Sequence, residues 1–282
     1  MITIRTGYPG EDAPFRALWK AGFGDTDGTI DQYFSIVHQP ENGMLLFVGA
    51  QPAAMTMMVP CALAAPDGSA QPASCIYAFT THPEYQGRGL GLQLLDAAIA
   101  ELHARGIPHV VLHPASESLY NMYRDKSGFT DAFFVREQTL SAHPAAPAAQ
   151  FSLRSARPGE YLALRERLLA GHGHIVWSET ALALQKCYNQ DEGGDLYICT
   201  YADTQVCVCA APREGQLLIS ELLAPEPVSP EAAAQAICHA LGFLSGLLRV
   251  PKHAELSAQP VHFGMLCGVE LPYCGYFGID FN

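Results

Sequence analysis

The segment from Cys75 to Ala104 constrains the fold of this chain more than any other, because it reads as a strand, a glycine-rich turn and a long helix. Residues 75–81 predict the strand, which Pro83 closes. Apolar residues at helical spacing between Gly89 and Ala104 predict the helix. Such a succession of elements indicates an α/β architecture.

The turn has the chemistry of an anion site. Gly87, Gly89 and Gly91 let the backbone approach a ligand without interference from a Cβ atom. The turn opens directly into a helix, whose first N–H groups lack internal partners and, together with the helix dipole, attract negative charge. Arg88 adds a positive side chain beside them. The turn is therefore predicted to cradle a phosphate or pyrophosphate.

Three families use such cradles. The dinucleotide-binding fingerprint needs Gly-x-Gly-x-x-Gly and an acidic residue near the end of the next strand, whereas here the spacing is Gly-x-Gly-x-Gly and that strand ends in His113-Pro114. A P-loop needs Gly-Lys-Ser/Thr, which is absent. The third family is the GNAT acyltransferases, with Gln/Arg-x-x-Gly-x-Gly/Ala after a strand that ends in proline. The run that closely resembles it reads Phe79-Thr80-Thr81-His82-Pro83-Glu84-Tyr85-Gln86-Gly87-Arg88-Gly89-Leu90-Gly91.

This resemblance implies a coenzyme A site. In the family the strand before the turn splays from its neighbour and binds the pantetheine arm, and the turn binds the pyrophosphate. Carried over by position, Phe79, Thr80 and Thr81 would line the arm. The pyrophosphate would be held by Gln86, Gly87, Arg88, Gly89, Leu90 and Gly91. Acetyl-CoA is then the expected co-substrate, with no metal.

A second family feature is a tyrosine on a helix ahead of a Gly-Phe pair, which often protonates the leaving thiolate. Tyr123 precedes Gly128-Phe129 by five residues, where four is common, and Tyr120 lies on nearly the same helix face. We take Tyr123 as the expected acid and Tyr120 as the alternate, and simple packing of both rings stays open. No general base is identifiable, although acidic or imidazole side chains occur at Asp25, Asp27, Glu84, His113 and Glu117.

The second half of the chain restarts the first. Ile4-Arg5-Thr6 with Pro9-Gly10-Glu11 recurs at identical spacing as Leu153-Arg154-Ser155 with Pro158-Gly159-Glu160. Gly43 and its strand match Gly194 and 196–200, and 76–83 match 218–225. Matches in the same order indicate a repeated fold. We expect a GNAT-like acyl-CoA-binding domain at 1–140, an Ala/Pro-rich linker at 141–150, and a degenerate GNAT-like domain at 151–282 that lacks the glycine turn. Each domain is expected to be a mixed, mostly antiparallel sheet flanked by helices.

Composition excludes several classes of protein. The net charge of -12, without any basic run, disfavours nucleic-acid binding and slightly favours amines as partners. No apolar run is long enough for a membrane span, and no signal peptide is evident, so a cytoplasmic location is expected. The nine cysteines are expected to be buried, reduced thiols. The Gly171-His172-Gly173-His174 run is expected to be a mobile loop, and Glu221 is expected on a solvated sheet face.

The predicted function is transfer of an acyl group, most simply acetyl, from coenzyme A to a small-molecule or peptide amine by direct attack. The alternatives are a non-catalytic acyl-CoA sensor and a partner-binding protein with a vestigial site. The acceptor, the acyl-chain length and the oligomeric state are not specified by the sequence.

Overall fold

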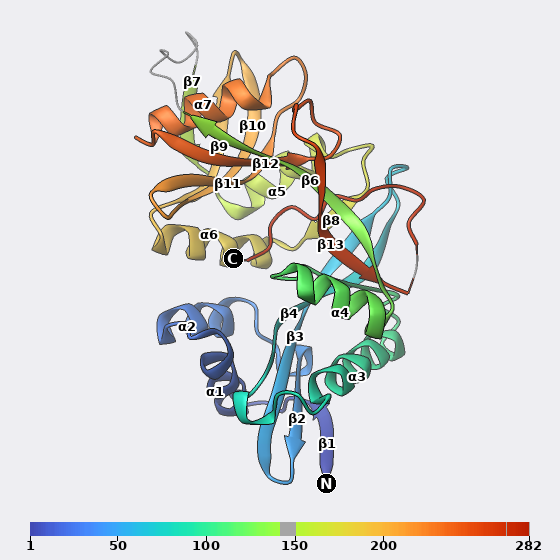
Figure 1. Ribbon diagram of the computed structural model, residues 1–282. Coiled ribbons are helices and arrows are strands. Elements are labelled where there is room, and N and C mark those ends of the chain that lie inside the picture. The colour runs from blue at the N-terminus through green and yellow to red at the C-terminus, as the bar shows by residue number, and fades with distance from the viewer. Residues whose placement is uncertain (142–150, 269, 282) are drawn as a thin grey trace. The chain divides into compact units, whose positions relative to one another are not determined.

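A computed structural model describes residues 1–141, 151–268 and 270–281 as two compact units (Figure 1). Unit 1 comprises Met1–Leu63, Ala70–Asp131 and Gly264–Glu270, and unit 2 comprises Ala64–Ser69, Ala132–Phe263 and Leu271–Asn282. Apart from Ser141, the predicted linker at 141–150 lies outside the described residues. The predicted boundaries 1–140 and 151–282 are contiguous in sequence, whereas each compact unit is assembled from several segments.

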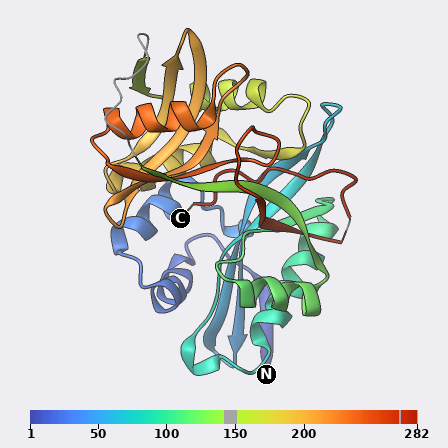
Figure 2. The ribbon, with the colours of Figure 1, turned by 45° about the horizontal axis from the view of Figure 1, so that its top comes forward.

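Unit 1 is a sheet with strands in the order β1-β2-β3-β4-β5-β13. The β1–β2, β2–β3 and β5–β13 pairs are antiparallel, and β4–β5 is parallel. Figures 1 and 2 show α1 and α2 on one face of this sheet and α3 and α4 on the other. Its elements are β1 (Ile2–Thr6), α1 (Asp12–Phe23), α2 (Asp27–Ile36), η1 (Pro40–Asn42), β2 (Gly43–Val48), β3 (Gln51–Ala64), β4 (Ala70–Thr81), η2 (Pro83–Tyr85), α3 (Leu90–Ala104), β5 (His109–Leu112), α4 (Glu117–Ser127) and the end of β13 (Pro260–Cys267).

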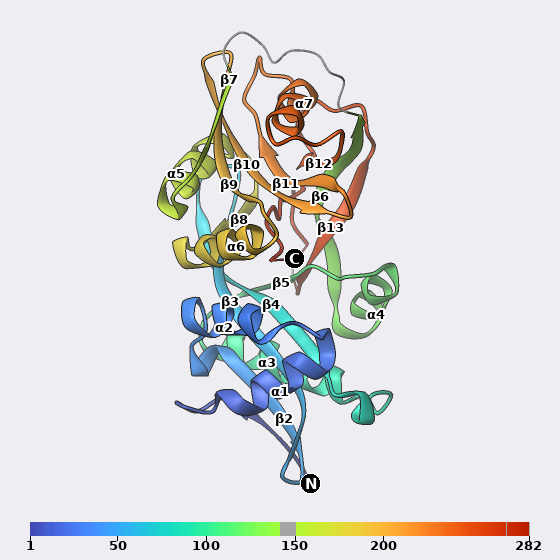
Figure 3. The same ribbon diagram turned by 90° about the vertical axis from the view of Figure 1, so that its left-hand side faces the viewer.

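Unit 2 repeats this arrangement with strands in the order β7-β9-β10-β11-β12-β6. The parallel pair β11–β12 stands where the parallel pair β4–β5 stands in unit 1, and the β7–β9, β9–β10, β10–β11 and β12–β6 pairs are antiparallel. Figure 3 shows α5 and α6 on one face of this sheet and α7 on the other. Its elements are β6 (Phe129–Ser141), β7 (Phe151–Ser155), α5 (Pro158–Leu168), β8 (His174–Trp177), α6 (Glu179–Asp191), β9 (Asp195–Tyr201), β10 (Thr204–Arg213), β11 (Gln216–Leu223), α7 (Pro230–Ala240) and β12 (Ser245–Pro251).

The two halves of the sequence exchange a strand. In unit 1, β5 pairs along its edge with Met265, Leu266 and Cys267 of β13. In unit 2, β12 pairs along its edge with residues Val135 to Ser141 of β6, a strand from the first half of the sequence. The mixed, mostly antiparallel α/β fold that the sequence predicts is confirmed, but each sheet is completed by a strand from the other half.

Each unit has its own apolar core. In unit 1, the predicted apolar face of α3 is buried through Leu90, Leu94, Leu95, Ala98 and Leu102, which pack with Met265 and Cys267 of the exchanged strand. In unit 2, α7 buries Ala233, Ala234 and Ile237 against strands β10, β11 and β12. These helices cover their sheets because their apolar residues recur at helical spacing, which places them on one face.

The repeated sequence motif forms the same contact in both units. Arg5 holds Glu11 through two hydrogen bonds of 2.7 and 2.6 Å, and Arg154 contacts Glu160 at 3.3 Å. The glutamate in each case also accepts from the backbone N–H three residues before it, at 3.1 and 3.2 Å, at the start of a helix. The internal repeat therefore reflects the same arginine–glutamate contact at the start of α1 and of α5.

Two of the predicted matches are out of register. Thr6 pairs with Met44 and Ser155 with Tyr197, so Gly43 corresponds to Leu196 and not to Gly194. Each glycine instead serves its own packing: a Cβ on Gly43 would lie 2.7 Å from the Phe15 ring, and one on Gly194 would lie 2.2 Å from the Ala210 carbonyl oxygen.

The second shifted match concerns the strand before the turn. Helices α3 and α7 end in the same way. Gly106 and Gly242 have φ values of 78° and 80°, and the backbone N–H of the next residue in each case donates to the carbonyl five positions earlier. From this common end, Val110 corresponds to Gly246, so their parallel partners Ser74 and Leu217 also correspond. The predicted match of 76–83 with 218–225 is therefore displaced by one residue.

The structure overturns the expected solvated position of Glu221 and places His174 in a strand, outside the expected loop. Glu221 is fully buried, where it accepts hydrogen bonds from Tyr161 Oη at 2.8 Å and Arg165 Nε at 3.1 Å. His174 is buried at the start of β8 and bonds the His172 carbonyl and Glu166, so the glycine–histidine run is anchored at its end. Glu221 contacts residues that are distant in sequence, and His174 contacts a carbonyl two residues before it because of the shape of the turn. Neither contact can be read from the sequence pattern.

Of the cysteines, six are buried, two are intermediate and Cys274 is exposed, and all are free thiols. The expectation of buried thiols thus fails at Cys274. Among the described residues, no three His, Cys, Asp or Glu side chains are grouped so that they could hold a metal ion. None of the helices in the described part of the chain has both the length and the apolar character needed to cross a bilayer.

Candidate functional site

Strand β4 extends beyond the end of its parallel neighbour, β5, before the chain reaches the glycine turn. Its ladder with β5 covers Ala73–Cys75, and β5 ends at Leu112. On its other side β4 stays attached to β3 as far as His82, whose N–H donates to the Ala53 carbonyl at 2.9 Å. Residue Ala78 has a positive φ of 47°, which L-residues rarely adopt and which marks a local irregularity in the strand. The last part of β4 therefore extends beyond β5, as the resemblance implies for a strand that binds an extended ligand.

The turn has two backbone positions that favour glycine. Gly87 and Gly89 have φ values of 74° and 72°, and a Cβ at either would meet no atom within 4 Å. Glycine is therefore favoured here by backbone conformation rather than by crowding within the protein. Gln86 braces the turn, because its Nε2 donates to the Thr81 carbonyl at 3.1 Å. Arg88 is exposed, donates to the Glu84 carbonyl at 2.9 Å and lies over the Tyr85 ring.

The start of α3 offers unused N–H donors. Gly89 is the N-cap residue, and it has no side chain that could accept from the first turn. The first intrahelical bond runs from Gln93 N–H to the Gly89 carbonyl, so the preceding N–H groups of the helix have no intrahelical acceptor. Gly91 faces the end of β4: a Cβ there would lie 3.1 Å from Thr81 Oγ1 and 3.3 Å from the Phe79 ring. The predicted residues of strand, turn and helix thus lie together.

The two tyrosines of α4 lie in the core of unit 1. Tyr123 is 6% exposed, and its ring lies between Phe79 on β4, with ring centroids 6.5 Å apart, and Phe129, at 5.7 Å. Burial raises the pKa of the Tyr123 phenol above its ordinary value, so the phenol stays protonated at neutral pH. Tyr120, one helical turn earlier, is also buried in this core. The ring of Tyr123 thus contacts the strand that is expected to line the ligand.

The unusual spacing from Tyr123 to Gly128 has a local explanation. Helix α4 runs through Ser127 and ends at Gly128, which has φ 68° and donates its N–H to the Tyr123 carbonyl. This is the left-handed C-terminal cap that glycine favours. The additional residue is therefore accommodated in the last turn of the helix, and it does not displace Tyr123 from the β4 side.

The side chains considered as bases have other partners or lie on the surface. Asp25 accepts from Trp19 Nε1 at 2.8 Å, and Asp27 pairs with Lys20 at 2.8 Å. Glu84 is exposed, and its backbone carbonyl accepts from Arg88. Helix α1 approaches β4 closely here, because a Cβ on Gly22 would lie 2.2 Å from Thr80 Oγ1. The face of β4 next to α1 is thereby closed at Thr80, which the sequence pattern did not reveal.

The corresponding turn of unit 2 is built differently. Helix α7 ends at the position of α3 but has 11 residues where α3 has 15, so it begins four residues later, about one helical turn. Ser229 caps it by accepting from Ala232 N–H at 3.3 Å, and Pro230 at its first position has no N–H. The connection from 224 to 229 contains no glycine. Two of the donors at the start of the helix are therefore removed in unit 2, since Pro230 has none and that of Ala232 is bonded to Ser229.

Comparisons with known proteins agree with this geometry. Residues 3–126 match the family described as "Acetyltransferase (GNAT) domain". A solved GCN5-related N-acetyltransferase from Kribbella flavida is 18% identical with a TM-score of 0.69, covering 94% of this chain and 70% of that one. Another from Anabaena variabilis is 17% identical, with a TM-score of 0.70 and coverages of 94% and 72%. No curated protein matches the sequence.

A third solved structure, from Enterococcus faecalis, is described as a conserved protein of unknown function and probable N-acyltransferase. It is 15% identical, with a TM-score of 0.71, and the alignment covers 94% of this chain and 72% of that one. The predicted resemblance is confirmed by the family match over residues 3–126, and the shared fold extends over both units.

Proposed function

We propose that this chain, whose residues 3–126 match the GNAT acetyltransferase domain, is an N-acyltransferase that moves an acetyl group from acetyl-CoA to an amine. The observation that carries the proposal is the glycine turn at the start of α3. Its glycines have positive φ values, the first N–H donors of α3 have no side-chain cap, and strand β4 before the turn extends beyond its neighbour β5. The acceptor is a small-molecule or peptide amine, and the location is cytoplasmic.

Each part of the site has a role in binding the cofactor. The N–H groups of the turn and of the first turn of α3, aided by the helix dipole and Arg88, hold the pyrophosphate. Gln86 keeps the turn attached to Thr81. The backbone edge from Phe79 to Thr81 binds the pantetheine arm, which adds to the free edge of β4 as an extended peptide adds to a sheet, and the side chains of Phe79 and Thr81 line it on the α3 side.

In the reaction, a neutral amine attacks the thioester carbonyl, and the C–S bond breaks as the electron pair leaves on sulfur. Backbone N–H groups at the end of β4 stabilise the negative charge on the carbonyl oxygen. Tyr123 donates its phenolic proton toward the departing sulfur, and the amine loses a proton to solvent or to a base. Because burial keeps Tyr123 neutral, its main contribution is a hydrogen bond that strengthens as the thiolate forms.

Calorimetric titration with acetyl-CoA tests the cofactor site with a matched pair of variants. Gly89→Glu places a carboxylate in the turn, and we expect at least a hundredfold weaker binding, because a charge of the wrong sign replaces an anion site. Gly106→Glu is the control: Gly106 lies at the other end of the same helix with a similar φ of 78° and equally open surroundings. It carries the same backbone strain and should bind acetyl-CoA as the wild type does.

Equal binding by Gly89→Glu and Gly106→Glu would contradict the cofactor site. If the wild type binds acetyl-CoA tightly but releases no thiol with a broad panel of amines, the non-catalytic sensor replaces the enzyme. If the wild type does not bind acetyl-CoA at all, only the shared fold remains, and a partner-binding protein with a vestigial site becomes the better description.

A further inference from the structure

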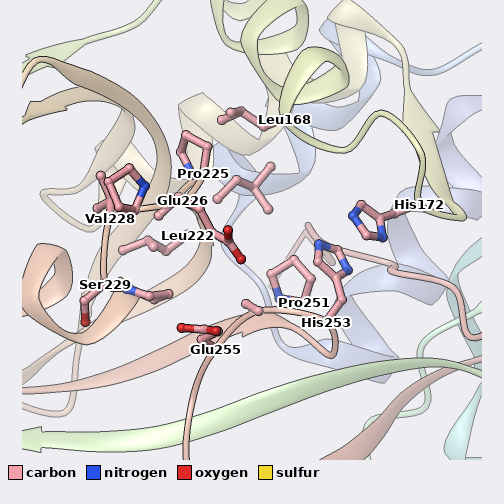
Figure 4. Close-up of a pocket in the computed structure, with 15 residues that line it drawn as sticks. Leu168, His172, Leu222, Pro225, Glu226, Val228, Ser229, Pro251, His253 and Glu255 are labelled. Carbon is pink, nitrogen blue, oxygen red and sulfur yellow. The ribbon is translucent and has the colours of Figure 1, made fainter.

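Unit 2 has a pocket at the place where unit 1 has its glycine turn. Its volume is about 610 Å³, and it is lined by the end of β11, the turn from 224 to 229, the start of α7, Leu168 and His172, and by Pro251 with residues 253–255 (Figure 4). The shorter α7 explains its position, because the additional helical turn that α3 has at its start is missing here. The volume lies in the range of small-molecule sites.

The chemistry of this pocket is opposite to that of an anion site. None of its lining residues is Lys or Arg, whereas Glu226 and Glu255 both contribute to it. Figure 4 shows the two carboxylates beside the same space. Within the described residues neither carboxylate has a hydrogen bond or ion pair, although those of Glu137, Glu160 and Glu166 in the same unit are paired. Unpaired carboxylates at a pocket leave a negative potential there.

Two histidines form one wall. The rings of His172 and His253 are stacked with centroids 3.5 Å apart and an interplanar angle of 2°, and Figure 4 shows them side by side. Both residues are exposed, but partial desolvation, together with the neighbouring histidines, lowers the pKa of His253 to about 4, and partial desolvation also lowers the pKa of His172. Both rings are therefore neutral near pH 7, and they do not cancel the two negative charges.

The rest of the wall is apolar and rigid. Leu168, Leu222 and Val228 contribute aliphatic surface, and the pocket is bordered by four prolines at 225, 227, 230 and 251. Proline fixes its own φ, so the turn loses little entropy when a ligand binds. An organic cation with a short methylene chain suits such a site, because its ammonium groups face carboxylates while its carbons contact the aliphatic wall.

We propose that this pocket binds a small organic ammonium compound, such as a linear diamine, with Glu226 and Glu255 as its counter-charges. The site is separate from the cofactor turn of unit 1 and does not depend on acetyl-CoA. The second unit thus has, in place of a degenerate anion cradle, a cation site at the equivalent end of its parallel strand pair.

Equilibrium dialysis of the full chain with radiolabelled 1,4-diaminobutane, at low ionic strength and without acetyl-CoA, tests the site. We expect saturable binding that weakens as salt is added, since exposed charges are screened. Replacing both carboxylates in Glu226→Gln/Glu255→Gln should weaken binding about tenfold, the combined effect of two partly exposed ion pairs. The control Glu179→Gln/Glu214→Gln removes the same charge from exposed positions of unit 2 outside the pocket, and it should bind as the wild type does.

Two more variants locate the bound diamine. Ala254→Trp fills the pocket without a change of charge and should also reduce binding, which long-range attraction alone would not explain. Gly89→Glu, in unit 1, should leave diamine binding intact even as it abolishes acetyl-CoA binding. The proposal is overturned if the wild type shows no saturable binding of 1,4-diaminobutane, or if the Glu226/Glu255 and Glu179/Glu214 double variants bind it equally well.

Discussion

The starts of α3 and α7 differ more than any other equivalent parts of the two units. Helix α3 begins after Gly89, which cannot cap it and which, like Gly87, has a positive φ, so its first N–H donors have no side-chain cap. Helix α7 begins one turn later with Ser229 as a cap and Pro230 without an N–H. The same strand order therefore carries the proposed anion site in one unit and a capped helix start in the other. In our two proposals, the framework of the repeated fold is kept while a few turn residues reverse the charge that it attracts.

The strands before these turns differ as well. By the corrected register, Ala78, the residue with positive φ in β4, corresponds to Glu221 in β11. Strand β11 is also irregular there, because its ladder with β10 passes from Glu221 to Ile219 across a bulge. Unit 2 uses the irregularity to bury a carboxylate against Arg165, whose pKa Glu221 raises although burial acts to lower it. In unit 2 the residue at this position of the strand therefore contributes to the core.

The largest expected effect comes from breaking that buried pair. Glu221→Ala removes the fully buried counter-charge of Arg165 and leaves the guanidinium only its contact with the Glu166 carboxylate at 3.1 Å, so we expect the free energy of unfolding to fall by about 3 kcal/mol. Urea unfolding followed by circular dichroism measures it. The double variant Arg165→Met/Glu221→Leu removes both charges and should recover most of the loss. A loss below about 1 kcal/mol in Glu221→Ala would show that Arg165 finds another partner or water.

Amide hydrogen exchange with and without acetyl-CoA compares the two turns directly. Saturation at one hundred times Kd stabilises the bound state by about 2.7 kcal/mol, which corresponds to about a hundredfold slower exchange of amides that open only in the free protein. We expect this protection from Gly87 to Gln93 and no direct protection from Ala224 to Ala232. Equal protection of both segments would mean that unit 2 also takes up the cofactor, or that the whole chain opens as one unit.

Tyr123→Phe tests the helix next to β4. Losing one positioned proton donor should lower kcat about tenfold to hundredfold, while the Kd for acetyl-CoA stays nearly unchanged. Steady-state assay of thiol release gives kcat, and calorimetry gives Kd. Tyr120→Phe is the matched control on the same helix, because it removes the same hydroxyl one turn away. If Tyr120→Phe loses the activity and Tyr123→Phe keeps it, the two assignments are exchanged.

The smallest expected effect concerns the repeated arginine–glutamate contact. Glu11→Gln should cost about 1 kcal/mol, because the two-bond pair with Arg5 is partly buried and Arg5 also lies over the Tyr8 and Phe47 rings. Glu160→Gln should cost less, since its contacts are solvent-exposed. Urea midpoints of the two variants measure the difference, and a larger effect at Glu160 would contradict the ranking.

The pH dependence of Glu160 gives a further check on the same contact. Hydrogen bonds from Arg157, through its side chain and backbone, and from Arg154 lower the pKa of Glu160 to about 2. A lowered folded pKa stabilises the native state above the ordinary carboxyl value and loses that stabilisation as pH falls toward 2. The wild type should therefore lose slightly more stability than Glu160→Gln between pH 5 and 3, as measured by urea midpoints at both pH values.

The sequence predicted the elements of unit 1 well because local signals determine them. Glycines with positive φ, the apolar face of α3 and the cap at Gly128 are all visible in short runs of residues. What it missed depends on partners far along the chain. Glu221 resembles a solvated strand residue until α5 brings Arg165 beside it, and His253 has no signal in sequence that it stacks on His172.

The repeat shows the same limit in another form. Arg5 and Glu11 recur with identical spacing because both units start a helix in the same way. The glycines at 43 and 194 share only an amino-acid type, and the ladders put them at different positions. Strand exchange could not be predicted, because β6 and β13 pair with strands that are distant from them in the sequence. The cofactor and catalytic assignments remain predictions that the experiments above address.

The exchanged strands determine when this protein can fold during its synthesis. Residues 1–131 emerge from the ribosome with every element of unit 1 except β13, so the edge of β5 stays open until the last part of the chain arrives. An open, apolar edge is prone to pair with other chains, and contacts so distant in sequence form slowly. We therefore expect that neither half can be expressed alone as a well-behaved domain, and that nascent chains spend time in need of protection from aggregation.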